Sequence, residues 1–271
     1  MAEPTGEILL SVSELCLKLG RAPILHQVQF DVHDRVRPGT VTGQIVSVLG
    51  PSGVGKTRLL RLIAGLDQAD AGKIHGIKGA LMEPGSVGVV FQDYPLLRHR
   101  TVRSNLEIAG IANGLSQQKA IKRANELLAG FRMSDRGDYY PAQLSGGQRQ
   151  RVAIAQQLVV PKTLLLMDEP FSGLDPMALE DVIHVIVEVA NLDELNTVII
   201  VTHDIRAAII VSDTILMLGR ARTEDGKTVP GARIQAFYDL VELGLAWHAD
   251  IEHMPAFSEL ESELKARFKL L

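Results

Sequence analysis

The chain has 271 residues, 46% of them hydrophobic, so it is long enough to bury a sizeable apolar core. Its 28 Lys and Arg against 32 Asp and Glu give a net charge of −4 spread along the chain, which argues against nucleic-acid binding or a polybasic membrane anchor. Cys16 is the single cysteine and excludes an internal disulfide, as suits a reducing cytosol. No stretch approaches the ~20 apolar residues of a membrane-spanning helix and no secretory pattern is visible, so we expect a cytoplasmic protein.

Strand and helix patterns alternate along most of the chain. Apolar runs predict strands at 8–18, 28–32, 44–49, 87–91, 163–167, 197–201 and 215–218. Helical periodicity is clearest at 56–64, through much of 93–157, and at 178–190. Strands joined by helical crossovers indicate a mainly parallel sheet, and the long helical stretch indicates a subdomain inserted into it. The sequence therefore predicts an α/β fold.

The two remaining segments differ in character from this pattern. Residues 34–42 predict a surface extension, to which we assign no chemistry. After Gly219 a polar loop is predicted over 220–231, and apolar residues then recur at helical spacing over 234–241 and 257–268. We therefore predict a helical C-terminal tail, and favour its packing on the chain's own domain over a partner surface.

A glycine-rich segment follows the predicted strand 44–49 and opens the helix 56–64. It satisfies the pattern G-x-x-x-x-G-K-[ST] with Gly50, Pro51, Ser52, Gly53, Val54, Gly55, Lys56 and Thr57. Glycines let the backbone N–H groups turn toward phosphate oxygens, and the helix presents its positive end to the same anion. Lys56 would neutralise the outer phosphates, and the Thr57 hydroxyl would ligate Mg²⁺. The segment predicts a nucleotide site, in which we include Arg58 while expecting its side chain to point toward solvent.

The predicted strand 163–167 ends in two carboxylates, Asp168 and Glu169. A buried parallel strand places such acids at the carboxyl edge of the sheet, beside the phosphate loop. Asp168 is then suited to hold Mg²⁺, and Glu169 to act as the general base for the attacking water. A pair of solvated turn acids is the alternative, which the phosphate loop makes the weaker interpretation.

Between these two motifs lies the signature segment, Leu144, Ser145, Gly146, Gly147 and Gln148. The segment offers a second anion site, formed by the Ser145 hydroxyl, by exposed backbone N–H groups and by a helix that begins nearby. With this motif in place, the chain resembles the ATP-binding cassette (ABC) ATPases over residues 8–218. The resemblance implies that the segment covers the γ-phosphate of an ATP held by a second cassette, with two ATP enclosed in a head-to-tail dimer, most simply a homodimer.

The resemblance also implies the fold and the division of the chain. It implies a RecA-like P-loop NTPase core with N-terminal antiparallel strands and an inserted α-helical subdomain. The nucleotide-binding domain would span 1–218, with the core at 1–92 and 159–218, the helical subdomain at 93–158, and the tail at 219–271.

Other family positions occur in the expected order. Gln92 matches a glutamine that reaches Mg²⁺ and the attacking water, and His203 matches a histidine that contacts the γ-phosphate. Ser172, Gly173, Leu174 and Asp175 match a loop that communicates across the dimer. Leu19 stands where many members stack an aromatic ring on adenine, so we expect weaker ATP affinity or looser base selectivity, because ring stacking contributes about 1 kcal/mol.

The sequence leaves the role of this ATPase open between two classes. The run after Gln92 is similar to importer segments in which an apolar groove receives a helix of a transmembrane permease, so docking is expected near Tyr94–Leu97. The strings 140–151 and 201–208 most resemble bacterial importers of the nitrate, sulfonate and taurine type. This reading implies a substrate-binding protein as a further partner and a position on the inner face of the membrane, although export stays open. The alternative is a soluble ABC ATPase in assembly or remodelling.

Overall fold

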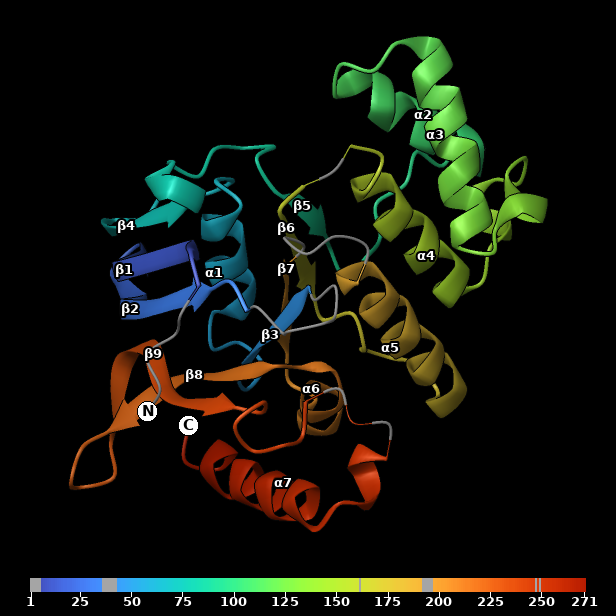
Figure 1. Cartoon of the computed structure of the whole chain (residues 1–271). Helices are drawn as coiled ribbons and strands as arrows, with labels where there is room; N and C mark the ends of the chain where they lie inside the picture. Colours follow the sequence, from blue (N-terminus) through green and yellow to red (C-terminus); the bar gives the residue numbers. More distant parts are fainter. Residues whose placement is uncertain (1–5, 36–42, 161, 192–196, 247, 249) are drawn as a thin grey trace.

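The computed structural model describes residues 6–35, 43–160, 162–191, 197–246, 248 and 250–271 (Figure 1). Within these ranges one nine-stranded sheet has the order β4-β1-β2-β9-β8-β3-β7-β6-β5. The strands are β1 Ile8–Leu19, β2 Ala22–His33, β3 Gln44–Leu49, β4 Ala71–Gly76, β5 Gly88–Val90, β6 Leu164–Asp168, β7 Thr197–Thr202, β8 Thr214–Arg222 and β9 Thr228–Asp239. The α-helices are α1 Lys56–Ile63, α2 Val102–Ala112, α3 Gln117–Gly130, α4 Gly146–Gln157, α5 Pro176–Ala190, α6 Ile205–Val211 and α7 Pro255–Phe268.

The sheet is parallel from β8 to the β5 edge, and most pairs from β8 to the β4 edge are antiparallel. Strands β8, β3, β7, β6 and β5 run parallel to one another. Strand β1 pairs antiparallel with both β2 and β4, and β9 pairs antiparallel with β8. Strands β3, β6 and β7 are buried along their whole length, which is why they read as continuous apolar runs. The predicted α/β fold with N-terminal antiparallel strands is confirmed.

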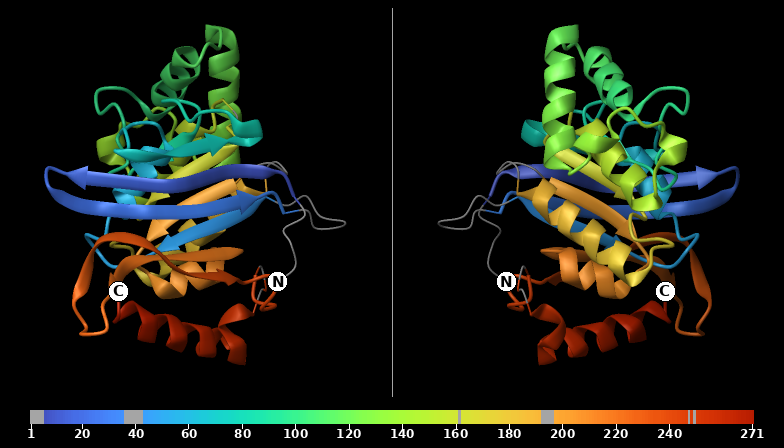
Figure 2. Two further views of the ribbon diagram at one scale, coloured as in Figure 1. Left: turned by 90° about the vertical axis from the view of Figure 1, so that its left-hand side faces the viewer. Right: turned by 90° about the vertical axis from the view of Figure 1, so that its right-hand side faces the viewer.

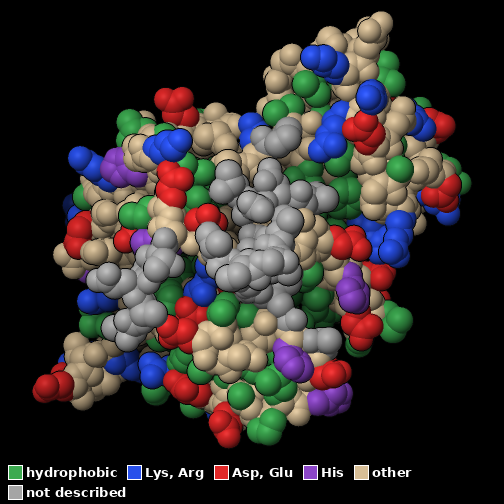
Figure 3. Space-filling model, viewed as in Figure 1, with side chains coloured by type: hydrophobic (Ala, Val, Ile, Leu, Met, Phe, Trp, Pro, Cys, Tyr) green, Lys and Arg blue, Asp and Glu red, His purple; other side chains and the backbone are tan. Residues whose placement is uncertain are grey.

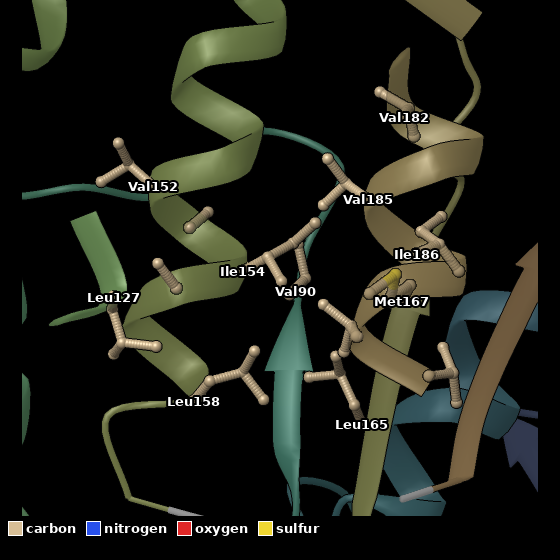
Figure 4. Close-up of a cluster of buried hydrophobic side chains, with 14 of the residues drawn as sticks. Val90, Leu127, Val152, Ile154, Leu158, Leu165, Met167, Val182, Val185 and Ile186 are labelled. Carbon is tan, nitrogen blue, oxygen red and sulfur yellow. The ribbon is translucent and has the colours of Figure 1, made fainter. Parts of the chain in front are cut away.

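Successive residues of the central strands pack on opposite faces of the sheet. In β6, Leu164 and Leu166 join a cluster that contains α1, whereas Leu165 and Met167 join one that contains α4 and α5. Figure 4 shows the second cluster, where β5 and β6 meet α3, α4 and α5. The green pair α2 and α3 stands away from the sheet in Figures 1 and 2, on the side of α4.

The C-terminal segment differs from the predicted tail. The helix expected over 234–241 is wrong, because β9 spans Thr228–Asp239. The loop expected over 220–231 is shorter than predicted and covers only 223–227, because β8 continues to Arg222. The backbone groups of β8 pair with those of β9, and this ladder overrides a helical spacing of apolar residues. Phe237, which the helical pattern assigned to a buried face, is 57% exposed on β9.

Helix α7 does form, and it packs on the chain's own sheet. Phe257, Leu260 and Leu264 are buried in a cluster with residues of β3, β8 and α6. Arg206 of α6 bonds to Glu252 at 2.8 Å and lies over the Phe257 ring. The tail therefore completes a third part of the core, on the α6 side of the sheet.

Some segments were missed or lie outside the described residues. Strand β4 was not predicted, since its sequence is polar and it pairs only at the sheet edge. Of the predicted extension, Asp34 and Arg35 are described and 36–42 lie outside the described residues. Arg35 anchors its start by donating to Thr214 Oγ1 at 3.1 Å and to Asp239 Oδ2 at 2.6 Å. None of the helices in the described ranges is long and apolar enough to cross a bilayer.

Over the described residues on the face shown in Figure 3, acidic and basic side chains are interspersed. This distribution agrees with the even spread of charge along the sequence.

Replacing Leu264 by Ala tests the packing of α7. Leu264 is fully buried, so we expect the free energy of unfolding in urea to fall by about 2–5 kcal/mol. Leu270→Ala is the control, because Leu270 is 62% exposed and should change stability by less than about 0.5 kcal/mol. Equal stability of the two variants would contradict the placement of α7 in the core.

Candidate functional site

The phosphate loop, residues 50–57, connects β3 to α1. A Cβ on Gly50 would lie 2.3 Å from the Leu218 carbonyl oxygen, so only glycine fits against β8. Gly55 has φ 117°, which favours glycine, and it precedes α1 without a side-chain cap. The first turn of α1 also has no acidic residue. Its N–H groups therefore have no competing anion from this turn, which suits them to a phosphate.

Lys56 lies under this loop and is almost fully buried. Its Nζ donates to the carbonyl oxygens of Gly50 at 2.8 Å and Pro51 at 3.2 Å. Nζ also lies 3.1 Å from Glu169 Oε1, and the Lys56 side chain is 5% exposed. The ammonium is thus aimed at the concave side of the loop, where an anion would bind.

Glu169 connects Lys56 to the predicted histidine. His203 Nδ1 lies 2.8 Å from Glu169 Oε2, and the His203 backbone N–H donates to the same oxygen at 3.3 Å. Glu169 follows β6 and His203 follows β7, and these strands are parallel neighbours. Parallel pairing therefore brings together side chains that are 34 residues apart. The carboxylate is 12% exposed and the imidazole 48%, so the histidine forms the solvent side of the group.

Asp168 and Thr57 form the oxygen-donor pair of the site. The Thr57 hydroxyl donates to Asp168 Oδ1 at 3.0 Å. Burial raises the pKa of Asp168, and the hydroxyl bond opposes this only in part. A hydroxyl and a carboxylate beside each other are the ligand types that Mg²⁺ takes, so the residues present fit that ion.

Gln92 contacts the 172–175 loop, whose Ser172 N–H donates to the Glu169 carbonyl oxygen at 3.2 Å. Gln92 Nε2 donates to Ser172 Oγ at 3.4 Å. Within the described part of the chain, Gln92 forms no hydrogen bond with Thr57 or Asp168. Asp175 caps α5 by accepting from Ala178 N at 3.0 Å, so its side chain has a structural partner. Gly173 adopts φ 72°, which its lack of a side chain permits, and Leu174 is half-buried against the core.

The signature segment, 144–148, begins helix α4. Ser145 and Gln148 form a capping box: Gln148 N donates to Ser145 Oγ at 3.3 Å and Ser145 N to Gln148 Oε1 at 3.0 Å. Leu144 is buried and anchors the segment, whereas Ser145 and Gly146 are exposed. No contact given for the described residues joins this segment to the phosphate loop of the same chain.

Leu19 and Arg58, the two remaining residues of the predicted nucleotide site, are both exposed. Leu19 ends β1 and is 49% exposed. Arg58 donates to Asp67 Oδ2 at 3.2 Å, and its side chain is 44% exposed. This partner and this exposure agree with a side chain that points away from the phosphate loop.

Sequence reasoning missed two side chains that reach the segment after Glu169. Gln150 Nε2 and the Tyr94 hydroxyl both contact the Pro170 carbonyl oxygen. Gln150 lies among apolar residues of α4 and Tyr94 in an irregular segment, and no spacing rule connects either to Pro170.

Comparisons with known proteins agree with this geometry. The ABC transporter family pattern matches residues 34–172. The chain is 41% identical over 188 residues to the sulfate/thiosulfate import ATP-binding protein CysA of Synechococcus elongatus, covering 68% of this chain and 54% of that protein. It is 40% identical over 201 residues to the spermidine/putrescine import ATP-binding protein PotA of Pseudomonas aeruginosa, covering 72% and 54%. The chain thus spans little more than half the length of these relatives.

Solved structures share the fold. A dimeric ATP-binding cassette in a post-hydrolysis state, bound to ADP and Pi, superimposes with a TM-score of 0.68 at 27% identity, covering 86% of this chain and 99% of that one. The cbiO1 structure from Clostridium perfringens has a TM-score of 0.73 at 24% identity and covers 97% and 96%.

Replacing Asp168 by Asn tests the electrostatics of the site. The raised pKa means that the folded chain binds this proton more tightly than the unfolded chain. Wild-type stability therefore falls relative to the variant as pH rises from about 4 through the folded pKa, and the deficit persists at pH 7. Without nucleotide or Mg²⁺, we expect the variant to unfold at an equal or higher temperature at pH 7.

Asp225→Asn serves as the control, since it removes the same charge from a side chain that is 73% exposed. With Mg²⁺ and ATP present, the wild type and this control should gain thermal stability, and Asp168→Asn should gain much less. A variant that is less stable than wild type without ligand, yet stabilised normally by Mg²⁺ and ATP, would contradict the site.

Proposed function

Because this chain belongs to the ABC transporter family, we propose that it is the ATP-hydrolysing subunit of a bacterial importer. The observation that carries the ATPase proposal is the convergence of Lys56, Glu169 and His203 at one edge of the sheet, beside a phosphate loop. Relatives named as import ATP-binding proteins support the direction of transport.

In the proposed reaction, the phosphate loop and the N-terminus of α1 bind the triphosphate of ATP. Lys56 neutralises the outer phosphates, and Thr57 and Asp168 hold Mg²⁺, which would polarise the terminal phosphate. Glu169 accepts a proton from the attacking water, and His203 orients that carboxylate through its 2.8 Å contact. Gln92 would reach Mg²⁺ and the attacking water, and its bond to Ser172 connects it to the 172–175 loop.

We propose a head-to-tail dimer as the active form. Each signature segment would cover the ATP bound to the phosphate loop of the other cassette, with Ser145 and the first turn of α4 facing its terminal phosphate. The exposure of Ser145 and Gly146 supports this arrangement, as does the dimeric state named for a related cassette with ADP and Pi. The 172–175 loop would then lie at the dimer interface.

The proposed membrane partner is a transmembrane permease that docks on Tyr94–Leu97. Tyr94 and Leu96 pack partly into the core, while Leu97 is 39% exposed. ATP-driven closure of the cassettes would move the permease between inward- and outward-facing states, with a substrate-binding protein delivering the cargo. The chain would then sit on the cytoplasmic face of the membrane. The named relatives are ATP-binding proteins of sulfate/thiosulfate and of spermidine/putrescine import. The nitrate, sulfonate and taurine type therefore stays a prediction from the sequence.

The proposed division of labour follows the predicted boundaries. Residues 93–158 would move against the core at 1–92 and 159–218 during closure, and 219–271, with β9 and α7, would brace the side that carries α6.

Replacing Glu169 by Gln tests the hydrolytic role. We expect ATP binding to persist and turnover to fall by about 10²–10⁴-fold, because the amide cannot accept the proton of the attacking water. Glu180→Gln, on the exposed face of α5, removes the same charge and should hydrolyse ATP at the wild-type rate. Normal turnover of Glu169→Gln in a steady-state phosphate-release assay would disprove the general-base assignment.

Affinity purification of the tagged chain from gently solubilised membranes of its native host tests the transport role. We expect a multi-span membrane protein to co-purify in defined stoichiometry, and substitution of Leu97 by Asp should release it. Recovery of soluble partners alone, at the same yield for both chains, would favour the assembly or remodelling class.

A further inference from the structure

The carbonyl oxygen of Pro170 receives two side-chain donors from distant parts of the chain. Gln150 Nε2 of α4 donates to it at 3.1 Å, and the Tyr94 hydroxyl donates to it at 3.4 Å. A carbonyl oxygen has two lone pairs, so these two donors satisfy it completely. Pro170 follows Glu169 directly, and the two donors therefore act one residue away from the proposed general base.

Glu169 has a backbone that needs external support. Its φ is 47°, in the left-handed region that non-glycine residues seldom adopt. Its N–H donates to Val201 O at 2.9 Å and its carbonyl accepts from Ser172 N at 3.2 Å. Such a conformation persists only where the surroundings fix it, and it sets the direction in which the carboxylate points. The next hydrogen bonds along this turn are those that the Pro170 carbonyl oxygen accepts from Gln150 and Tyr94.

Gln150 lowers the stability of the folded state at its position, so we look for a function of its bond to Pro170. The side chain is 1% exposed, and its Oε1 has no hydrogen-bond partner in the structure. A buried amide oxygen without a partner destabilises the folded state, whereas a methionine would fill the same volume without this cost. The amide nitrogen and its bond to Pro170 are the features that methionine could not supply.

Tyr94 is suited to donate at any physiological pH. Burial raises the pKa of Tyr94 to about 12, so its hydroxyl keeps its proton. Tyr94 packs partly into the cluster formed with α4 and α5, and its own φ of 45° also lies in the left-handed region.

We infer that Gln150 and Tyr94 are positioning residues, which aim the Glu169 carboxylate by fixing the Pro170 carbonyl. The inference rests on the proposed ATPase function and extends it to two residues that do not touch the nucleotide. Gln150 belongs to the helix that the signature segment opens, and Tyr94 to the segment proposed to receive the permease. Each of these two proposed subunit interfaces therefore contributes one hydrogen bond to the turn that carries Glu169.

The test compares Gln150→Met and Tyr94→Phe with wild type in the purified full-length chain. We expect Gln150→Met to lower kcat about tenfold and to change the KM for ATP less than about twofold, because a misplaced base slows the chemical step without weakening binding. Its unfolding temperature should stay the same or rise, since the unpartnered amide oxygen is gone. Tyr94→Phe should lower kcat by a smaller factor, because its bond is the longer of the two.

Two matched controls separate positioning from general damage. Tyr238→Phe removes a hydroxyl that donates to Glu263 at 2.7 Å on the C-terminal part, where burial likewise raises the pKa to about 12. Gln118→Met removes an exposed amide on α3. Both controls should keep the wild-type kcat. In the double variant of Gln150 and Tyr94, the loss in kcat should be smaller than the product of the single losses, because both act through one carbonyl.

The outcomes distinguish this inference from the proposed function. Wild-type kcat in both Gln150→Met and Tyr94→Phe, while Glu169→Gln is inactive, overturns the positioning role and leaves the ATPase proposal standing. A fall in kcat that is matched by a fall in unfolding temperature also overturns it, because a structural role then suffices. Absence of ATPase activity in wild type overturns the proposed function and this inference with it.

Discussion

The charge of Lys56 is the constraint on which the candidate site depends. An ammonium that is 5% exposed needs acceptors on every side, and the structure supplies two loop carbonyls and the Glu169 carboxylate. Those acceptors exist only because the loop after β3 curls tightly, which requires glycine at position 50, and because β6 ends at the same edge of the sheet. A phosphate group brings the same kind of acceptor, so the arrangement that satisfies Lys56 also suits it to ATP.

The sheet brings the other residues of the site close to Lys56. Parallel pairing of β3, β7 and β6 aligns Gly50, His203 and Glu169 at the positions that follow three adjacent strands. The strands are buried on both faces, so their ends are fixed by packing against α1 on one side and α4 and α5 on the other. This edge of the sheet places the Glu169 carboxylate between Lys56 and His203.

The helices connect other parts of the chain to this edge of the sheet. The signature segment begins α4, and the same helix reaches back through Gln150 to the turn after Glu169. Helix α6 begins just after His203, and α7 packs on it with the salt bridge of Arg206 and Glu252. The signature helix is thus bonded to the turn after Glu169, whereas α6 and α7 support the sheet on the side of His203.

The sequence by itself determined the α/β class and located three motifs: the phosphate loop, the two acids at the end of β6, and the signature segment. Their signals are local, since each motif sits within a few residues of a strand end or a helix start. The tertiary structure alone decided that 228–239 is a strand. Its backbone hydrogen bonds with β8 stabilise the strand more than the helical spacing of apolar residues favours a helix. The tertiary structure also decided the contacts of Glu169 with Lys56 and His203 and of Gln150 and Tyr94 with Pro170, because they join residues that only the folding of the sheet brings within bonding distance.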